Sequence, residues 1–213
     1  NSGFLGSDSF SFKANDWTVD SNTASVSITV QPVPVAIVWK DLVGVSVSGN
    51  TLTKTTATGW GNAGAASTLI IPGDGGVDFR ANETNTWRII GLSASNVNAS
   101  YVTNVYGLLL SNTGTVQVYE SGVLRGTFGS YVVGDRVGVY RTGTSVAYKK
   151  NGSTFYTSTI ASSGTVLVDA AIYTSGGTIA DAMIGGGVVA PNIAPVANAQ
   201  SVTVVQNTPK AIT

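Results

Sequence analysis

Short β-type runs separated by turn residues recur along the middle of the chain, and this repetition limits the fold more than any other feature of the sequence. Between Ala36 and Val188, a run rich in Val, Ile, Thr or aromatic residues ends at Gly, Asn or Asp roughly every ten residues. Many short strands at such a spacing are typical of β-sandwiches and jelly rolls. No segment has the apolar periodicity of a helix longer than a turn or two. We therefore expect an all-β, two-sheet antiparallel β-sandwich of the jelly-roll kind.

These runs predict twelve strands in the central region, at residues 37–39, 43–47, 67–71, 77–80, 87–92, 105–110, 116–120, 136–141, 146–150, 154–157, 166–172 and 182–184. The clearest hairpin turn is Asn151-Gly152, because this pair favours the type I′ turn whose twist matches the flanking strands. A two-residue loop there predicts Tyr148 directly opposite Phe155.

Composition excludes several classes of protein. Hydrophobic residues make up 43% of the 213 and charged residues only 10%, and the formal net charge is zero. A nucleic-acid-binding protein needs a basic stripe to displace counterions, and no run of Lys or Arg exceeds two residues. No apolar run approaches the ~20 residues of a membrane-spanning helix. We therefore expect neither a nucleic-acid partner nor a membrane span.

The residue types available also argue against catalysis. Histidine and cysteine are absent, which excludes Ser-His-Asp and Cys-His mechanisms and removes the commonest zinc ligands. The only glutamates are Glu83 and Glu120, and no carboxylates cluster on one strand, as hydrolysis of a glycosidic bond would require. We expect no catalytic residues and no cofactor. Structural calcium remains an option, with Asp74 and Asp78 as candidate oxygen ligands, although Asp in turns also caps local backbone N–H groups.

The two ends of the chain differ from its centre, which suggests three domains. In residues 1–35, Phe10 and Phe12 alternate with polar residues, and Val26 and Ile28 do so after a turn, which predicts two strands with one apolar face each. Pro32 then ends the second strand. Residues 36–188 form the sandwich, and residues 189–213 form a linker followed by one strand at 200–206.

The terminal segments resemble known repeats. GFLGSDSFSFKANDWTVDSNTASVSITV (3–30) resembles the second half of the cadherin-like, immunoglobulin-like tandem repeats of large bacterial surface proteins, and APVANAQSVTVVQNTPKAIT (194–213) resembles their beginning. The resemblance implies an extracellular or cell-surface location, an adhesin-like setting and neighbouring repeats as partners. Two arrangements stay open: the chain crosses two separate repeats, or its terminal strands pair with one another through Val26, Ile28, Val202 and Val204.

The central region resembles concanavalin-like and SPRY-like sandwiches of bacterial surface proteins and polysaccharide-active enzymes. The residues that carry this are GWGNAGA (59–65), GDGGVDF (73–79), GLS (91–93), GD (134–135) and YKKNG (148–152). The resemblance implies a lectin-like fold, whose members bind glycans, bind peptides or have no known ligand.

Aromatic and polar side chains in loops give a candidate ligand site. Sugars are recognised by flat aromatic faces and planar polar groups, and arginine suits carboxylate or sulfate groups. The predicted ligand-binding residues are Trp60, Asn62, Arg80, Arg88, Tyr101 and Tyr131. Trp60 has an alternative role as an anchor for its loop, while Trp39 and Trp87 are expected to be buried.

These observations favour a non-catalytic carbohydrate-binding module of an extracellular multidomain bacterial protein, with a neutral or anionic glycan as its ligand. A structural spacer or adhesin stalk without a small ligand is the main alternative. A fragment of a polysaccharide lyase or hydrolase is a third.

Overall fold

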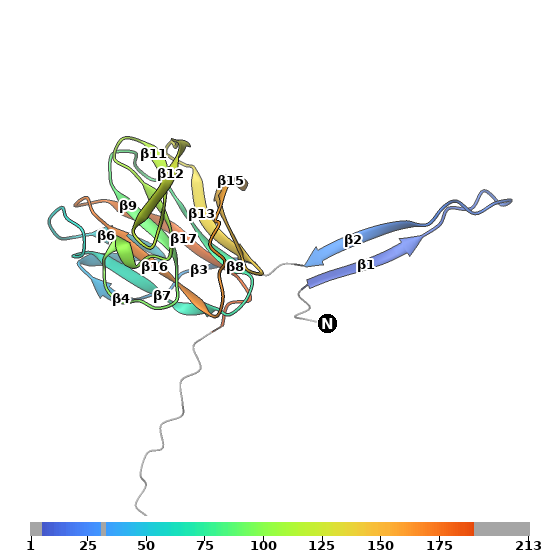
Figure 1. Cartoon of the computed structure of the whole chain (residues 1–213), viewed down its shortest axis with the longest axis horizontal. Helices are drawn as coiled ribbons and strands as arrows, with labels where there is room; N and C mark the ends of the chain where they lie inside the picture. The colour runs from blue at the N-terminus through green and yellow to red at the C-terminus, as the bar shows by residue number, and fades with distance from the viewer. Residues whose placement is uncertain (1–5, 31–32, 190–213) are drawn as a thin grey trace, which may run out of the picture.

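A computed structural model describes residues 6–30 and 33–189 of the chain (Figure 1). Within these ranges the secondary structure is almost entirely antiparallel β, with one short 3-10 helix, η1 (Tyr101–Thr103). The strands from Val35 onward form two large sheets that pack into a sandwich. The all-β, two-sheet fold expected from the spacing of the runs is therefore confirmed.

One sheet has seven strands in the order β12-β11-β10-β9-β16-β7-β4. Their bounds are β12 (Val123–Ser130), β11 (Thr115–Glu120), β10 (Tyr106–Leu110), β9 (Arg88–Ser93), β16 (Val166–Ile172), β7 (Gly64–Ile71) and β4 (Trp39–Val43). Strands far apart in sequence lie side by side at its centre, since β16 pairs with both β9 and β7.

The other sheet has eight strands, of which seven follow the order β15-β14-β13-β8-β17-β6-β5 and the eighth, β3, lies beside β17. Their bounds are β15 (Ser153–Thr157), β14 (Ser145–Lys150), β13 (Arg136–Thr142), β8 (Gly75–Arg80), β17 (Thr178–Gly186), β6 (Thr51–Lys54) and β5 (Val45–Ser48). A short strand, β3 (Val35–Ala36), also pairs with β17.

Alternation along the strands builds the core between the sheets. Ile90 and Leu92 of β9 and Val77 and Phe79 of β8 are fully buried and belong to one apolar cluster, because every second residue of a strand faces the same side. Trp39 also lies in this core, with its indole N–H donated to the carbonyl of Asn50 at 3.0 Å. The expected burial of Trp39 is confirmed.

Most of the expected strands exist, and the differences have local causes. Strands β6 and β12 were not predicted: β6 has a single Leu among Thr and Lys, and Arg, Gly and Ser interrupt the apolar residues of β12, so the pattern is weak. The run at 43–47 is divided at Gly44, whose positive φ of 53° breaks the strand between β4 and β5. Ile37 is buried but lies outside any strand.

The hairpin between β14 and β15 has the predicted turn but not the predicted register. Asn151 and Gly152 have φ of 49° and 81°, as a type I′ turn requires. However, a β-bulge after Tyr148 shifts the pairing, so Tyr148 lies opposite Tyr156 and not Phe155. The prediction of a Tyr148–Phe155 cross-strand pair was wrong because sequence spacing carries no sign of this bulge.

The N-terminal strands β1 (Gly6–Phe12) and β2 (Ala24–Val30) form a separate two-stranded sheet in the predicted places. Trp17 lies in the loop that connects them and is 98% exposed. Val26 and Ile28 are 37% and 47% exposed, so no described residue covers the apolar face of this hairpin. Val202 and Val204, with which they were expected to pair in one of the two arrangements, lie outside the described residues.

In the part of the chain that the structure describes, no helix has the length and apolar character needed to cross a bilayer. The three-domain division stays a prediction. The described part of the sandwich runs from Val35 to Val189, because Val189 still exchanges backbone hydrogen bonds with Ile70.

Candidate functional site

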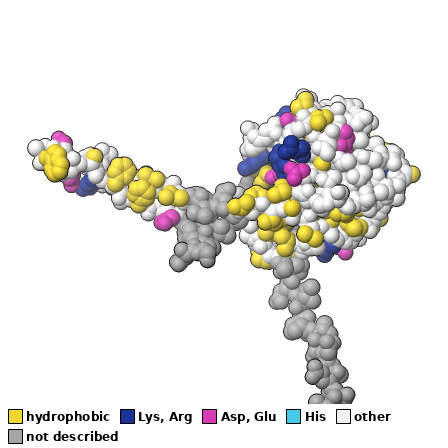
Figure 2. All heavy atoms as spheres, turned by 180° about the vertical axis from the view of Figure 1, so that it is seen from behind, with side chains coloured by type: hydrophobic (Ala, Val, Ile, Leu, Met, Phe, Trp, Pro, Cys, Tyr) yellow, Lys and Arg dark blue, Asp and Glu magenta, His cyan; other side chains and the backbone are white. Residues whose placement is uncertain are grey.

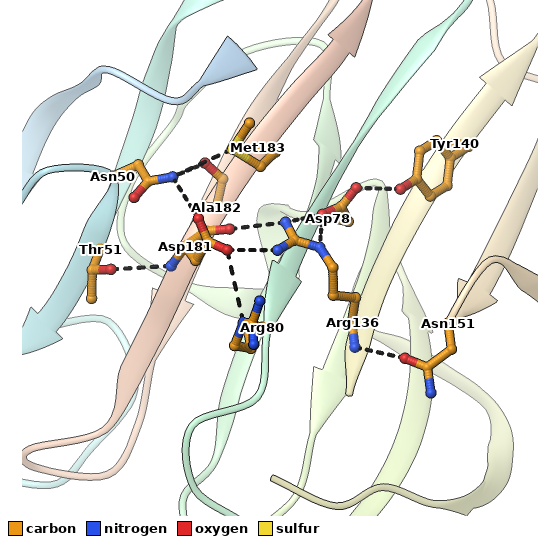
Figure 3. A network of polar contacts seen from close by, with 10 residues as sticks. All are labelled: Asn50, Thr51, Asp78, Arg80, Arg136, Tyr140, Asn151, Asp181, Ala182 and Met183. Atoms are coloured by element: carbon orange, nitrogen blue, oxygen red, sulfur yellow. Dashed lines mark hydrogen bonds and ion pairs between the residues drawn. The ribbon is translucent and has the colours of Figure 1, made fainter. Parts of the chain in front are cut away.

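A polar cluster lies on the outer face of the eight-stranded sheet, at the junction of β8, β13 and β17. Val77 and Phe79 of β8 point into the core, so the intervening Asp78 points outward, and Arg136 and Tyr140 of β13 follow the same alternation. Figure 3 shows these side chains converging with Asp181 of β17. On the face seen in Figure 2, Lys and Arg side chains gather beside carboxylates while most of the surrounding surface is uncharged.

Arg136 is the centre of this polar cluster. Its Nε donates to Asp78 Oδ1 at 2.7 Å, its Nη1 donates to Asp181 Oδ2 at 2.6 Å, and its Nη2 donates to the Asp181 carbonyl at 3.0 Å (Figure 3). The hydroxyl of Tyr140 donates to the other oxygen of Asp78. Hydrogen bonds to two carboxylates and a carbonyl restrict the rotation of the guanidinium, so the cluster holds its planar groups in one orientation.

The charges in the cluster stabilise one another. Partial burial opposes the charged form of Arg136, yet its hydrogen bonds to Asp78 and Asp181 raise the pKa of the guanidinium. The hydrogen bond from Arg136 likewise lowers the pKa of Asp181. Burial, followed by the hydrogen bond to Asp78, raises the pKa of Tyr140 well above its usual range. Near neutral pH, therefore, Tyr140 is a neutral donor and Asp181 is ionised.

A backbone irregularity places Asp181 in this cluster. The pairing of β17 with β8 shifts between Ala180 and Met183, which marks a β-bulge, and Asp181 within it has a positive φ of 47°. A left-handed conformation is unfavourable for a residue with a Cβ, and it persists where its surroundings hold it. Here Thr51 accepts the Asp181 N–H at 3.0 Å, and Arg136 holds its carbonyl and carboxylate. Bulges of this kind commonly redirect a side chain beside a functional site.

Two glycines let the Tyr140 ring lie close against the sheet, beside a hollow in the sheet surface. A Cβ on Gly76 or Gly138 would meet the ring of Tyr140 at 2.6 Å or 2.9 Å, so that ring lies over both glycines. The hollow has a volume of about 210 Å³ and is lined by Asp78, Arg136, Val137, Gly138, Tyr140, Lys149, Asn151 and Gly152. The ammonium of Lys149 lies 5.0 Å from the centre of the Tyr140 ring, as a cation–π contact.

The structure does not bring the six sequence-predicted ligand residues together. Arg80 borders the polar cluster, with its half-exposed side chain 3.8 Å from Asp181 Oδ2. Asn62 holds its own loop, since its Oδ1 accepts from Lys54 and its Nδ2 donates to Ala57. Trp60 and Tyr101 meet on the outer face of the other sheet, with ring centroids 4.8 Å apart.

Arg88 and Tyr131 lie in the interior, where a ligand cannot reach them. Arg88 has no exposed surface and Tyr131 has only 3%. The guanidinium of Arg88 lies 5.7 Å from the Tyr131 ring and donates to Thr86 and to the Glu83 carbonyl. Their prediction as ligand residues is corrected. Arg88 follows the core alternation of β9, and a local ion pair with Glu83 compensates its buried charge. Tyr131 packs into the main core and donates its hydroxyl to the Ser111 carbonyl at 2.9 Å.

The two candidate calcium ligands serve separate roles. Asp74 accepts a hydrogen bond from the Gly143 N–H at 2.7 Å, which ties two turns together, whereas Asp78 binds Arg136 and Tyr140. No group of three or more metal-ligating side chains occurs within residues 6–30 and 33–189.

Sequence reasoning missed Arg136, Tyr140 and Lys149. Their only sequence signal is period-2 alternation, which puts the first two on the solvent face of one strand, opposite a glycine-rich neighbour. That signal alone does not distinguish them from other exposed strand residues.

No protein-family model matches this sequence, and no curated protein matches it. Among solved structures, the SPRY domain of human HERC1 is 16% identical with a TM-score of 0.48, covering 64% of this chain and 88% of that domain. Stonustoxin is 8% identical with a TM-score of 0.49, and the match covers 72% of this chain but 28% of the toxin chain. The carbohydrate-binding module CBM66 from Bacillus subtilis is 8% identical with a TM-score of 0.40, covering 74% and 92%. At these values the similarities assign no function, and the fold rests on the strand order above.

Proposed function

We propose that this chain is a non-catalytic carbohydrate-binding module of an extracellular multidomain bacterial protein, and that the hollow on its eight-stranded sheet binds a sugar unit carrying a carboxylate or sulfate. The observation that carries the proposal is the combination, in one hollow, of an aromatic ring, fixed planar polar groups and Lys149. Among the described residues, the ammonium of Lys149 has neither a hydrogen bond nor a carboxylate within salt-bridge distance. An acidic sugar would supply that partner.

The charge of the site supports an anionic ligand. Arg80, Arg136 and Lys149 contribute three positive charges around the polar cluster, against two negative charges from Asp78 and Asp181, which leaves an excess of one positive charge. Tyr140 and Arg136 present a flat ring and a planar fork, the shapes that sugar recognition uses.

The arrangement of the acids supports a binding role over hydrolysis. Asp78 and Asp181 are both engaged by Arg136, so neither is available as an acid or base. Glu120 is buried and lies 2.9 Å from Arg125, and Glu83 accepts from Thr178. Hydrolysis of a glycosidic bond needs two carboxylates facing each other across that bond. A spacer without a ligand is the competing function, and the uncovered apolar face of the β1–β2 hairpin is the observation that favours it.

Replacing Lys149 by alanine is expected to weaken binding to an acidic polysaccharide about tenfold, because a charge-assisted hydrogen bond contributes roughly 1.5–3 kcal/mol. The measurement is affinity electrophoresis of the whole chain in gels containing polygalacturonate, alginate or a sulfated glycan. Lys40→Ala, which removes a half-exposed lysine from the other sheet, is the matched control and should migrate as wild type.

Three outcomes decide the proposal. Retardation by an acidic polymer that falls in Lys149→Ala supports it. A folded wild-type chain that no acidic polymer retards would overturn the hollow as a glycan site and favour the spacer. Release of unsaturated or reducing sugar ends during prolonged incubation with these polymers would overturn the non-catalytic assignment.

A further inference from the structure

Five aromatic side chains form a continuous row on the sheet opposite the hollow. In order they are Trp87, Tyr173, Trp60, Tyr101 and Tyr119, and we call them the aromatic row. Their successive ring centroids are 6.4, 5.2, 4.8 and 5.6 Å apart. All five side chains are partly exposed, so the expected burial of Trp87 was wrong. They come from five separate places in the sequence, so only the fold brings them together.

The aromatic row lies on the outer face of the seven-stranded sheet. Beneath it, Ile89, Leu109 and Ala171 are buried and form a cluster separate from the main core, directly opposite one another in neighbouring strands. Their sequence neighbours Ile90, Leu108 and Ala170 belong to the main core, so the three residues must point to the other side of the sheet. The row thus covers an apolar strip on the outside of the sandwich.

The hydroxyl and indole N–H groups of the aromatic row have no hydrogen-bond partner in the part of the chain that the structure describes. None of its three tyrosine hydroxyls and neither of its indole N–H groups makes a hydrogen bond within the described residues. By contrast, the hydroxyls of Tyr106, Tyr131 and Tyr148 and the indole N–H of Trp39 each donate to a specific acceptor. Tyrosine and tryptophan with one apolar face and one hydrated tip are the side chains that recognition surfaces favour.

A buried lysine fixes the loop that carries the centre of the row. Lys54 is only 2% exposed, and its ammonium donates to the carbonyls of Gly59 and Ile172 at 2.6 and 2.9 Å and to the side chain of Asn62. Burying an ammonium is unfavourable unless every proton finds an acceptor, and here all three do. Gly59 and Asn62 flank Trp60, so this lysine holds Trp60 in place on the sheet.

The aromatic row is also uncharged. The described cation–π contacts involve Phe79, Tyr131 and Tyr140, and none involves a ring of the row. No ring of the row hydrogen-bonds a charged side chain among the described residues. This distinguishes the row from the hollow, whose lining carries Asp78, Arg136 and Lys149.

We infer that the aromatic row is a second binding surface, which takes an uncharged polysaccharide chain along its length. Sugar C–H faces would cover the rings, and sugar hydroxyls would hydrogen-bond the unpartnered hydroxyl and indole groups. The neutrality of the row matches a neutral polymer, and its extent over five rings fits several consecutive sugar units. The inference shares the carbohydrate class of the proposed function but depends on none of the residues of the hollow.

The test is affinity electrophoresis of the full chain in gels containing uncharged polymers, namely mixed-linkage β-glucan, xyloglucan and galactomannan. Two variants remove rings: Trp60→Ala from the anchored loop and Tyr119→Ala from β11, a strand paired on both sides. Tyr156→Ala is the matched control, because Tyr156 is also partly exposed and without a hydroxyl partner but packs against Phe128 and Tyr148, away from the row. Thermal unfolding confirms that each variant is folded.

We expect at least one neutral polymer to retard the wild type, with binding weakened at least fivefold in both row variants and unchanged in Tyr156→Ala and Lys149→Ala. A folded wild type that no neutral polymer retards overturns the inference, as does equal retardation of Trp60→Ala and Tyr119→Ala. Concentration-dependent dimerisation that both row variants abolish would also overturn it, by assigning the row to a second copy of the chain. If the wild type binds a neutral polymer but no acidic polymer, the hollow is rejected as a glycan site, and the inference about the aromatic row still holds.

Discussion

Replacing Arg88 by alanine is expected to lower the free energy of unfolding by about 3–5 kcal/mol, because it leaves the partners of a fully buried cation unpaired. The Arg88 side chain donates to Thr86 Oγ1 at 2.6 Å and to the Glu83 carbonyl at 2.8 Å, and its guanidinium lies 6.0 Å from the Phe79 ring. Glu83 in turn accepts from the Thr178 N–H at 2.7 Å, so Arg88 links the turn before β9 to β17.

Urea unfolding followed by tryptophan fluorescence measures this effect. Arg80→Ala is the matched control, since the Arg80 side chain is half exposed and its ion pair with Asp181 is loose, so it should change the free energy of unfolding by less than ~1 kcal/mol. If Arg88→Ala unfolds at the same urea concentration as Arg80→Ala, then Arg88 does not have the structural role described above.

Asp169→Asn is expected to stabilise the protein at pH 8 by about 2–4 kcal/mol and to flatten its stability between pH 4 and 7. Asp169 of β16 is 1% exposed and has no cationic partner among the described residues. Burial raises its pKa to about 7, although a hydrogen bond from Ser93 at 3.3 Å opposes the rise. Asn104 is also buried, and neither its amide nitrogen nor its amide oxygen has a hydrogen-bond partner among the described residues.

The sign of the pH effect follows from this raised pKa. Well below the unfolded pKa of about 4, the carboxyl is neutral in both the folded and the unfolded chain, so its full stabilising contribution is present. As pH rises to about 7, the unfolded chain loses the proton while the folded chain keeps it, and the free energy of unfolding falls. Urea unfolding at a series of pH values measures how steeply the free energy of unfolding falls with pH. The Asp169→Asn substitution should remove this dependence.

Asp181→Asn is expected to change the pH dependence of the free energy of unfolding in the opposite direction to Asp169→Asn. Because the hydrogen bond from Arg136 lowers the pKa of Asp181, its contribution is present at neutral pH and is lost as the pH falls through that lowered value. If Asp169→Asn and Asp181→Asn change the pH dependence in the same direction, the roles given to these carboxyls are wrong.

The sites illustrate how far sequence patterns reach. The apolar run that ends at Trp39 correctly predicted its burial, and the recurring β-rich runs placed most strands in their positions. In β9 the alternation was assigned to the wrong face: Trp87 was expected to be buried and Arg88 to face a ligand, whereas Arg88 is fully buried and Trp87 is partly exposed on the outer face of the sheet. The Glu83 ion pair that neutralises Arg88 lies five residues away along the chain, and its geometry depends on how the turn before β9 folds.

The two surfaces proposed for ligands depend still more on tertiary structure. Asp78, Arg136 and Asp181 come from strands separated by more than forty residues, and a bulge at Asp181 completes the cluster. The rings of Trp60 and Tyr101 meet only because β16 lies between β9 and β7 and brings the flanking loops together.

The regular recurrence of short strands in the sequence determined by itself that the protein is an all-β sandwich, because strand formation and burial follow from local propensity and alternation. The missing histidine and cysteine likewise restricted the available chemistry. Only the tertiary structure decided which side chains face one another. Strand order and bulges place residues across sheets through long-range pairing, and neither leaves a periodic signal in the chain.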